Sequence, residues 1–207
     1  NTYLIATKPQ IHEKIFSQLK DKISGNNDLL IISILAGVTT LKIKNLLGDL
    51  PIVRTMPNLA VSEASGMSAL FANRYVNSKD KKTSSIIFGS VGEYIWVKDE
   101  EILDVITAIS GSGPAYYFYL TECLCKIAVE LGIDKESALL ITRQVAIGSG
   151  DIIRASKDSP LTLRNNVTSK GGTTEAAFKQ IINENEDFYN ILMNAVKNAI
   201  KKSHELS

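Results

Sequence analysis

The chain has little cysteine, little histidine and no excess of charge of either sign. Its 207 residues include two cysteines and two histidines, and 23 basic residues balance 22 acidic ones. Cys123 and Cys125 lie two residues apart in a helical pattern and point to different sides, so we expect no disulfide between them. No group of cysteine and histidine residues has the spacing of metal ligands, and no basic patch indicates nucleic-acid binding. Neither a metal site nor a nucleic-acid partner is predicted.

Long apolar runs are also missing. The longest, residues 29–38, is interrupted by Ser33 and Gly37, whereas a membrane-spanning helix needs about 20 apolar residues. No basic segment followed by an apolar stretch opens the chain, so no secretory leader is predicted. The content of 44% apolar and 22% charged residues is typical of a folded protein. A cytoplasmic protein with no membrane partner is the simplest interpretation.

A glycine-rich phosphate-binding turn is missing too. The chain begins at Asn1 rather than Met, and its first residues have the apolar pattern of a strand entered at its beginning or middle. No Gly-x-Gly-x-x-Gly follows that strand. Dinucleotide-binding domains hold the pyrophosphate with such a turn. The Gly111-Ser112-Gly113 segment is no substitute, because it follows a helical pattern and precedes Pro114. We expect that roughly two strands and two helices of such a domain are absent from this chain.

Residues 1–98 alternate apolar strand patterns with helical ones. A helix that starts near Pro9 is expected to stop at Ser24 and Gly25, and the run from Leu29 is typical of a strand buried on both faces. The expected strands are residues 3–6, 29–35, 52–56, 66–72 and 93–97, and the later helices are 39–47 and 82–91. This order predicts an α/β Rossmann-type domain with an open, mostly parallel sheet, incomplete at its N-terminus.

Residues 99–207 show helical patterns alone. Gly132 is expected to end one helix and Asp134 to cap the next. The expected helices are residues 100–110, 114–131, 135–156, 160–168, one starting at Glu175 behind a Thr173 or Thr174 cap, and 187–205. Their apolar faces are too many for one small bundle, so we predict a helical dimerisation domain and a homodimer or a higher homo-oligomer.

The segment of residues 160–174 has the composition of a ligand-binding loop. It predicts a helix, then a Gly-Gly turn, then two hydroxyl groups at a new helix N-terminus. Glycine lets backbone N–H groups approach a ligand, and a helix N-terminus suits a carboxylate. The alternative is that Thr173 and Thr174 only cap the helix.

The same segment closely resembles the signature of the pyrroline-5-carboxylate reductase family, and the resemblance covers essentially the whole chain. Lys170 stands where that family usually has proline. Four further segments match in the correct order: Ala6-Thr7-Lys8-Pro9-Gln10, Ile34-Leu35-Ala36-Gly37, Val53-Arg54-Thr55-Met56-Pro57-Asn58, and Thr107-Ala108-Ile109-Ser110-Gly111-Ser112-Gly113-Pro114-Ala115-Tyr116.

The resemblance implies reduction of the C=N bond of 1-pyrroline-5-carboxylate to L-proline with NADPH or NADH. It implies that Thr174 is catalytic, with its hydroxyl on the ring nitrogen, and that the amides of Gly171, Gly172 and Thr173 hold the substrate carboxylate. The implied cofactor-binding residues are Ala6, Thr7, Lys8, Pro9, Ile34, Leu35, Ala36 and Asn166. The implied substrate-binding residues are Glu100, Val167, Ser169, Gly171, Gly172, Thr173 and Thr174.

Two other interpretations remain open at this stage. A chain without the glycine-rich turn is compatible with a non-catalytic, oligomerising remnant that binds cofactor poorly. A related imine or β-hydroxyacid dehydrogenase of the same architecture is the third possibility, although the Gly171-Gly172-Thr173-Thr174 loop argues against it.

Overall fold

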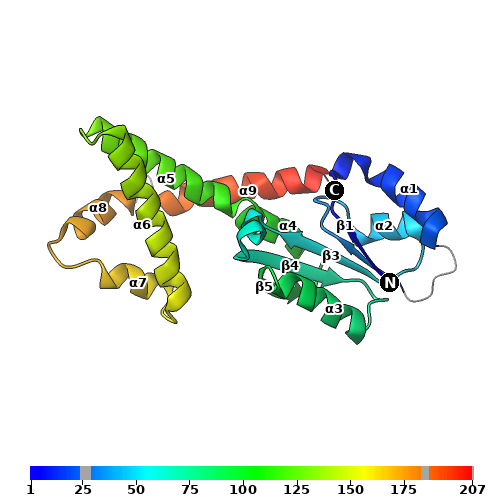
Figure 1. Cartoon of the computed structure of the whole chain (residues 1–207). Coiled ribbons are helices and arrows are strands. Elements are labelled where there is room, and N and C mark those ends of the chain that lie inside the picture. Colours follow the sequence, from blue (N-terminus) through cyan, green and yellow to red (C-terminus); the bar gives the residue numbers. More distant parts are fainter. Residues whose placement is uncertain (24–28, 183–186, 207) are drawn as a thin grey trace. The chain divides into compact units, whose positions relative to one another are not determined.

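A computed structural model describes residues 1–23, 29–182 and 187–206 (Figure 1). It divides the chain into two compact units, Asn1–Pro114 together with Val196–Ser207, and Ala115–Ala195. This division differs from the predicted boundary between residues 98 and 99. Residues 99–114 group with the sheet because Leu103, Asp104 and Ala108 are buried there.

The first unit contains a sheet whose strands lie side by side in chain order. These are β1 (Thr2–Ile5), β2 (Leu30–Ser33), β3 (Ile52–Pro57), β4 (Gly66–Ala72) and β5 (Gly92–Val97). The pairs β1–β2, β2–β3 and β4–β5 are parallel, which confirms the mostly parallel sheet, but β3 and β4 are antiparallel. The reversal follows from the short link of residues 58–65, which holds only the 3₁₀ helix η2 (Leu59–Glu63). A parallel crossover needs about a dozen residues or more.

Helices cover both faces of this sheet (Figure 1). The 3₁₀ helix η1 (Pro9–Ile11) leads into α1 (His12–Ile23), which packs with α2 (Thr40–Leu47) against Ile31 and Ile52 on one face. On the other face Phe88 of α3 (Ser78–Gly89) packs with Ile32 and its neighbours. The predicted helix stop at Ser24 and Gly25 lies outside the described residues.

Helix α3 begins four residues before the predicted start at Lys82. Asn77 accepts a hydrogen bond from the Asp80 N–H, and the Asp80 carboxylate accepts one from the Asn77 N–H. This reciprocal capping box satisfies two N–H groups at the helix end. The helix therefore starts at the cap, although its first turn has no apolar periodicity.

The rest of the chain is helical. After α4 (Ile102–Ile106), a π-helical turn η3 (Thr107–Gly111) leads to α5 (Gly113–Glu130), α6 (Lys135–Ala155), α7 (Pro160–Asn166), α8 (Thr173–Ile181) and α9 (Phe188–Leu206). Both predicted caps between α5 and α6 are confirmed: Gly132 has a φ of +99°, and Asp134 accepts N–H bonds from Glu136 and Ser137. In the described part of the chain no helix is long and apolar enough to cross a membrane.

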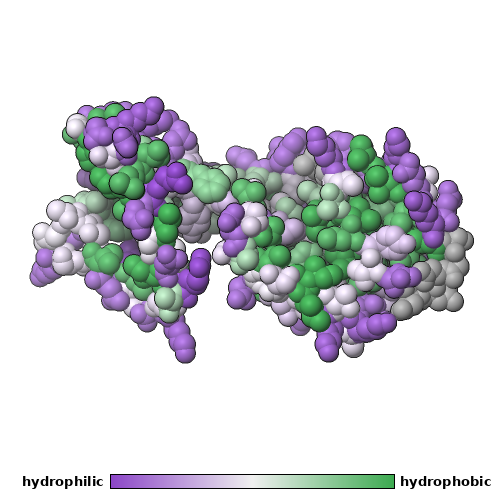
Figure 2. All heavy atoms as spheres, viewed as in Figure 1, coloured by the Kyte–Doolittle hydropathy of each residue, from purple (hydrophilic) through white to green (hydrophobic). Residues whose placement is uncertain are grey.

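The second unit has almost no core of its own. Among its described residues only Ala138 and Thr142 are buried. Large apolar side chains are exposed instead, including Leu131 (81%) and Leu140 (69%). Figure 2 shows hydrophobic residues at the surface of the helical unit. A unit of this size with so few buried apolar side chains needs another surface to cover it.

Candidate functional site

The two predicted cofactor segments begin side by side at one edge of the sheet. Ile5 pairs with Ser33 at the ends of β1 and β2, and the Ile34 N–H donates to the Ile5 carbonyl at 3.1 Å. Residues 6–9 and 34–36 therefore both follow the carboxyl ends of parallel strands, which is where open α/β sheets bind ligands. Ala6, Thr7 and Lys8 are exposed there.

Leu35 differs from the other members of this set. Its side chain is 2% exposed and belongs to the apolar core that α1 and α2 share. Only its backbone can face a cofactor. The sequence pattern could not separate these roles, because Leu35 continues the apolar run of β2 into the core.

The residues at this edge fit one part of a dinucleotide. The Lys8 ammonium and the Thr7 hydroxyl are chemically suited to phosphate and ribose oxygens. No Gly-x-Gly-x-x-Gly turn occurs in the sequence, so a pyrophosphate has no such turn to bind within this chain. Asn166 lies in the other unit, exposed at the end of α7, and its approach to a cofactor stays a prediction. The described residues hold no cluster of side chains suited to a metal ion.

The predicted substrate loop contains a tight β-turn over residues 169–172. The Gly172 N–H donates to the Ser169 carbonyl at 3.0 Å, and Gly171, the third residue, has a φ of +75°. A positive φ at this position is typical of a type II turn, whose second position favours proline. Lys170 occupies that second position.

The turn leads directly into α8. Gly172 is the N-cap, which corrects the prediction that Thr173 or Thr174 caps a helix starting at Glu175. A Cβ on Gly172 would lie 2.5 Å from Ser169 Oγ and 3.0 Å from the Ser169 carbonyl oxygen, so the turn leaves little room for a side chain here. The first α-helical bond joins the Ala176 N–H to the Gly172 carbonyl at 3.2 Å. The N–H groups of Thr173 and Thr174 therefore have no partner within the helix.

The predicted binding of the substrate carboxylate by the amides of Gly171, Gly172 and Thr173 stays a prediction, and the structure gives two of these N–H groups other partners. The Gly172 N–H is used in the turn, and the Gly171 N–H donates to Glu175 Oε2 at 2.8 Å. The amides of Thr173 and Thr174 remain for an anion. Sequence reasoning missed Glu175, although an acidic residue in the first helical turn is a known capping signal.

The other loop residues present polar groups at the surface. The Thr174 hydroxyl has no hydrogen-bond partner among the described residues and is half-buried. Val167 ends α7 and is 67% exposed, and Ser169 is exposed. The Arg164 guanidinium lies 5.4 Å from the centre of the Phe178 ring, which joins α7 to α8 across the turn.

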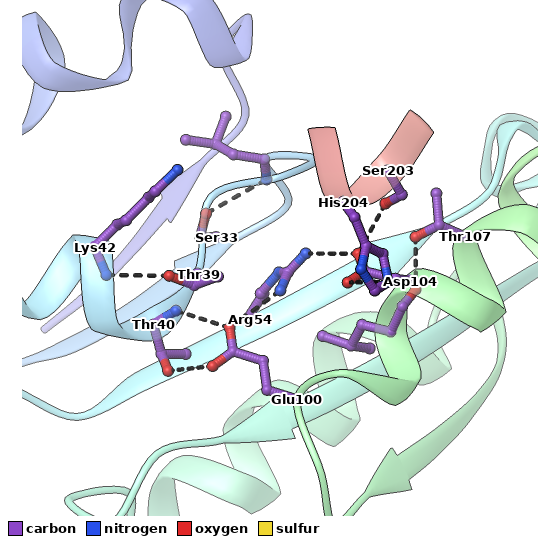
Figure 3. Close-up of polar contacts among 12 residues, drawn as sticks. Ser33, Thr39, Thr40, Lys42, Arg54, Glu100, Asp104, Thr107, Ser203 and His204 are labelled. Atoms are coloured by element: carbon purple, nitrogen blue, oxygen red, sulfur yellow. Dashed lines mark hydrogen bonds and ion pairs between the residues drawn. The ribbon is translucent and has the colours of Figure 1, made fainter. Parts of the chain in front are cut away.

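Glu100 lies in the first unit, in a buried ion-pair network (Figure 3). Its Oε1 accepts the Thr40 N–H at 2.8 Å and lies 3.1 Å from Arg54 Nη1, and its Oε2 accepts the Thr40 hydroxyl at 2.6 Å. Both carboxylate oxygens are thus engaged within the unit. The predicted contact of Glu100 with substrate stays a prediction, and the structure gives the side chain other partners.

Arg54 connects this carboxylate to a second one. Its Nη2 lies 3.6 Å from Asp104 Oδ1, which accepts the Ser203 hydroxyl at 2.8 Å, and His204 Nε2 lies 3.7 Å from Asp104 Oδ2. The network borders a hollow of about 440 Å³. Sequence reasoning missed Arg54 and Asp104 as functional residues. A charged residue inside the apolar strand pattern of residues 52–56 was the available signal, because a buried charge requires a partner.

Comparison with known proteins identifies the chain. Residues 100–206 match the family model for pyrroline-5-carboxylate reductase dimerisation. The chain is 34% identical to pyrroline-5-carboxylate reductase 1 of Bacillus subtilis (strain 168) over 205 residues, 99% of this chain and 67% of that protein. The chain belongs to the pyrroline-5-carboxylate reductase family. The Rossmann-like unit followed by a helical dimerisation domain is therefore the fold of a pyrroline-5-carboxylate reductase.

Two solved structures of pyrroline-5-carboxylate reductases match almost throughout. The Coxiella burnetii protein is 38% identical with a TM-score of 0.92, covering 100% of this chain and 76% of that one. The Plasmodium falciparum protein, solved with NADP bound, is 32% identical with a TM-score of 0.85, covering 99% of this chain and 76% of that one. The chain thus spans about two thirds to three quarters of the length of these reductases.

Proposed function

We propose that this protein reduces the C=N bond of 1-pyrroline-5-carboxylate to give L-proline, with NADPH or NADH as reductant. The single structural observation that best supports the proposal is the start of α8. There a glycine turn precedes two amides and a threonine hydroxyl that have no hydrogen-bond partner among the described residues. A small cyclic imine that carries a carboxylate has the matching groups.

Each part of this loop has a separate task. The amides of Thr173 and Thr174 hold the carboxylate at the positive end of the helix. The Thr174 hydroxyl donates a hydrogen bond to the ring nitrogen and supplies or relays the proton that the amine product gains. Val167 and Ser169 border the ring.

The sheet edge of the first unit provides the cofactor contacts. Residues 6–9 and 34–36 would hold part of the dinucleotide, and Asn166 is a further residue proposed to bind the cofactor. When bound, NADPH supplies the hydride that reduces the imine carbon. The protein has to orient the two reactants and exclude water.

The protein acts as a homodimer assembled through its helical unit. The support is the near absence of buried residues in this unit together with the dimerisation family match. A groove of about 760 Å³ between α5 and α6, lined by Phe118, Val129 and Ile147 among others, adds an apolar surface for the second copy. The cysteines Cys123 and Cys125 are free thiols, which supports a cytoplasmic location.

The test is oxidation of NADPH by the purified protein in the presence of pyrroline-5-carboxylate. Thr174→Val removes the hydroxyl while keeping the side-chain shape, and we expect kcat to fall by roughly 10²-fold, whereas Thr174→Ser retains activity. Thr162→Val on α7 is the matched control and should behave like the wild type. A folded, dimeric wild-type protein that does not oxidise NADPH would overturn the proposal and favour the non-catalytic, oligomerising interpretation.

A further inference from the structure

The loop between β2 and α2 is fixed at each of its ends. At its start the Ile34 N–H donates to the Ile5 carbonyl, and in its middle the side chains of Leu35 and Val38 are each 2% exposed. At its end Thr39 caps α2, and its side chain accepts the Lys42 N–H at 3.2 Å. What remains between the anchors is Ala36 and Gly37, where Gly37 has a φ of +71°.

The last anchor of this loop comes from a distant part of the chain. Thr40 is the first residue of α2, and both its N–H and its hydroxyl donate to the Glu100 carboxylate, at 2.8 and 2.6 Å. Thr40 itself is 7% exposed. A carboxylate at a helix N-terminus also interacts favourably with the helix dipole, so this contact holds the end of the loop through two bonds and one charge.

Arg54 holds the carboxylate in place. Its side chain is 5% exposed and lies on β3, next to the strand from which the loop emerges. Arg54 contacts both Glu100 and Asp104 (Figure 3). The Glu100 carboxylate, which accepts hydrogen bonds from Thr40, is therefore held in a fixed position on the sheet. Ser203 and His204 contact the network at Asp104.

We infer that Glu100, held by Arg54, is a positioning residue for the cofactor: it fixes the β2–α2 loop so that residues 34–36 keep the shape that binds the dinucleotide. Glu100 acts on Thr40 and through it on the loop, without touching the reacting atoms. This inference rests on the proposed function, since it takes the loop as part of the cofactor site.

The decisive variant is Thr40→Val. It removes the hydroxyl bond to Glu100 Oε2 and leaves the Thr40 N–H bond and the Arg54–Glu100 ion pair intact. Replacing Glu100 itself would remove the nearer of the two carboxylates that pair with the buried Arg54 and threaten folding. Ser203→Ala is the matched control, because it removes a bond of similar length from the same network on the Asp104 side.

Two measurements separate the outcomes. In fluorescence titration, Thr40→Val should raise the Kd for NADPH about fivefold, the scale of one lost hydrogen bond. The KM for pyrroline-5-carboxylate should stay near its wild-type value. In hydrogen exchange of the unliganded protein, residues 34–40 should lose protection in Thr40→Val alone. Ser203→Ala should change neither the Kd nor the protection of this loop.

Each contrary result has its own meaning. An unchanged Kd in Thr40→Val, or an equal increase in both variants, would overturn the positioning role. If the wild type neither binds nor oxidises NADPH, the proposed function fails. Unchanged protection of residues 34–40 in Thr40→Val would then overturn the inference independently.

Discussion

Lys170 is the residue at which the substrate loop departs from its family. It occupies the second position of the turn, its φ is negative, and its N–H makes no hydrogen bond to any described residue. Proline has a fixed negative φ and no N–H, so it meets both conditions at this position. In the unfolded chain, a lysine at position 170 therefore has more conformational freedom than a proline would have.

We expect Lys170→Pro to stabilise the protein. Reduced freedom of the unfolded chain at a compatible site contributes about 0.4–1 kcal/mol to the free energy of unfolding. Urea unfolding at a fixed protein concentration would measure the gain. Lys170→Ala controls for loss of the charge and should show little of this gain in the free energy of unfolding. A loss of stability in Lys170→Pro alone would mean that the turn does not have the geometry described.

Some residues that act through near neighbours in the sequence could be predicted, whereas contacts between distant parts of the chain could not. Gly132 and Asp134 form caps within a few residues of their own positions, and both were predicted correctly. By contrast, Glu100 and its hydrogen-bond partner Thr40 lie 60 positions apart in the sequence. No local pattern indicates that a carboxylate at residue 100 will bind the first turn of a helix that begins at residue 40.

At the scale of elements, the strands agree closely with their sequence patterns. The pattern of residues 66–72 matches β4 (Gly66–Ala72) in full, because a strand buried in a sheet must be apolar along its length. The strand directions were harder to predict in detail. The antiparallel β3–β4 pair depends on the length of the link between the strands, and the alternation of strand and helix patterns does not reveal it.

Helix α6 provides a test of stability against pH. Its N-cap is Asp134. A hydrogen bond from the Ser137 side chain, followed by the N–H bonds from Ser137 and Glu136, holds the pKa of this carboxyl below its ordinary value of 3.8. A lowered pKa in the folded state contributes stability that is present above pH 3.8 and is lost as the pH falls through the folded value. Wild-type protein should therefore lose this contribution in acid.

Asp134→Ala should lower the melting temperature near neutral pH. The difference in melting temperature between this variant and the wild type should become smaller as the pH falls below about 4. Asp134→Asn is the control, because asparagine caps equally well without titrating. Thermal unfolding followed by circular dichroism over a series of pH values measures both effects. Parallel curves for wild type and Asp134→Ala in acid would contradict the role of the charged cap.

At the scale of the whole molecule, we expect a second copy of the chain to cover the apolar surface of the helical unit. Ile147 lines the groove between α5 and α6 and is 55% exposed within one chain. Ile147→Glu places a charge where an apolar contact is expected, so the dimer should dissociate. Light scattering should then give the mass of a single chain, and helical content should fall.

The control for this change is Lys157→Glu, at an exposed position between α6 and α7. It alters charge without altering an apolar surface and should remain dimeric. A dimer that survives Ile147→Glu would place the subunit contact away from this groove.

The match between strand order in space and order along the chain has a consequence for synthesis. Each strand that leaves the ribosome finds its sheet neighbour already made, so no later strand has to insert between earlier ones. The hydrogen bond from Ser203 to Asp104 joins residues 99 positions apart and forms only after the chain has been translated through residue 203. We expect the helices of the second unit to become stable later still, when they meet a second copy of the chain. We therefore expect the sheet to become resistant to protease on the ribosome, and the helical unit only after release.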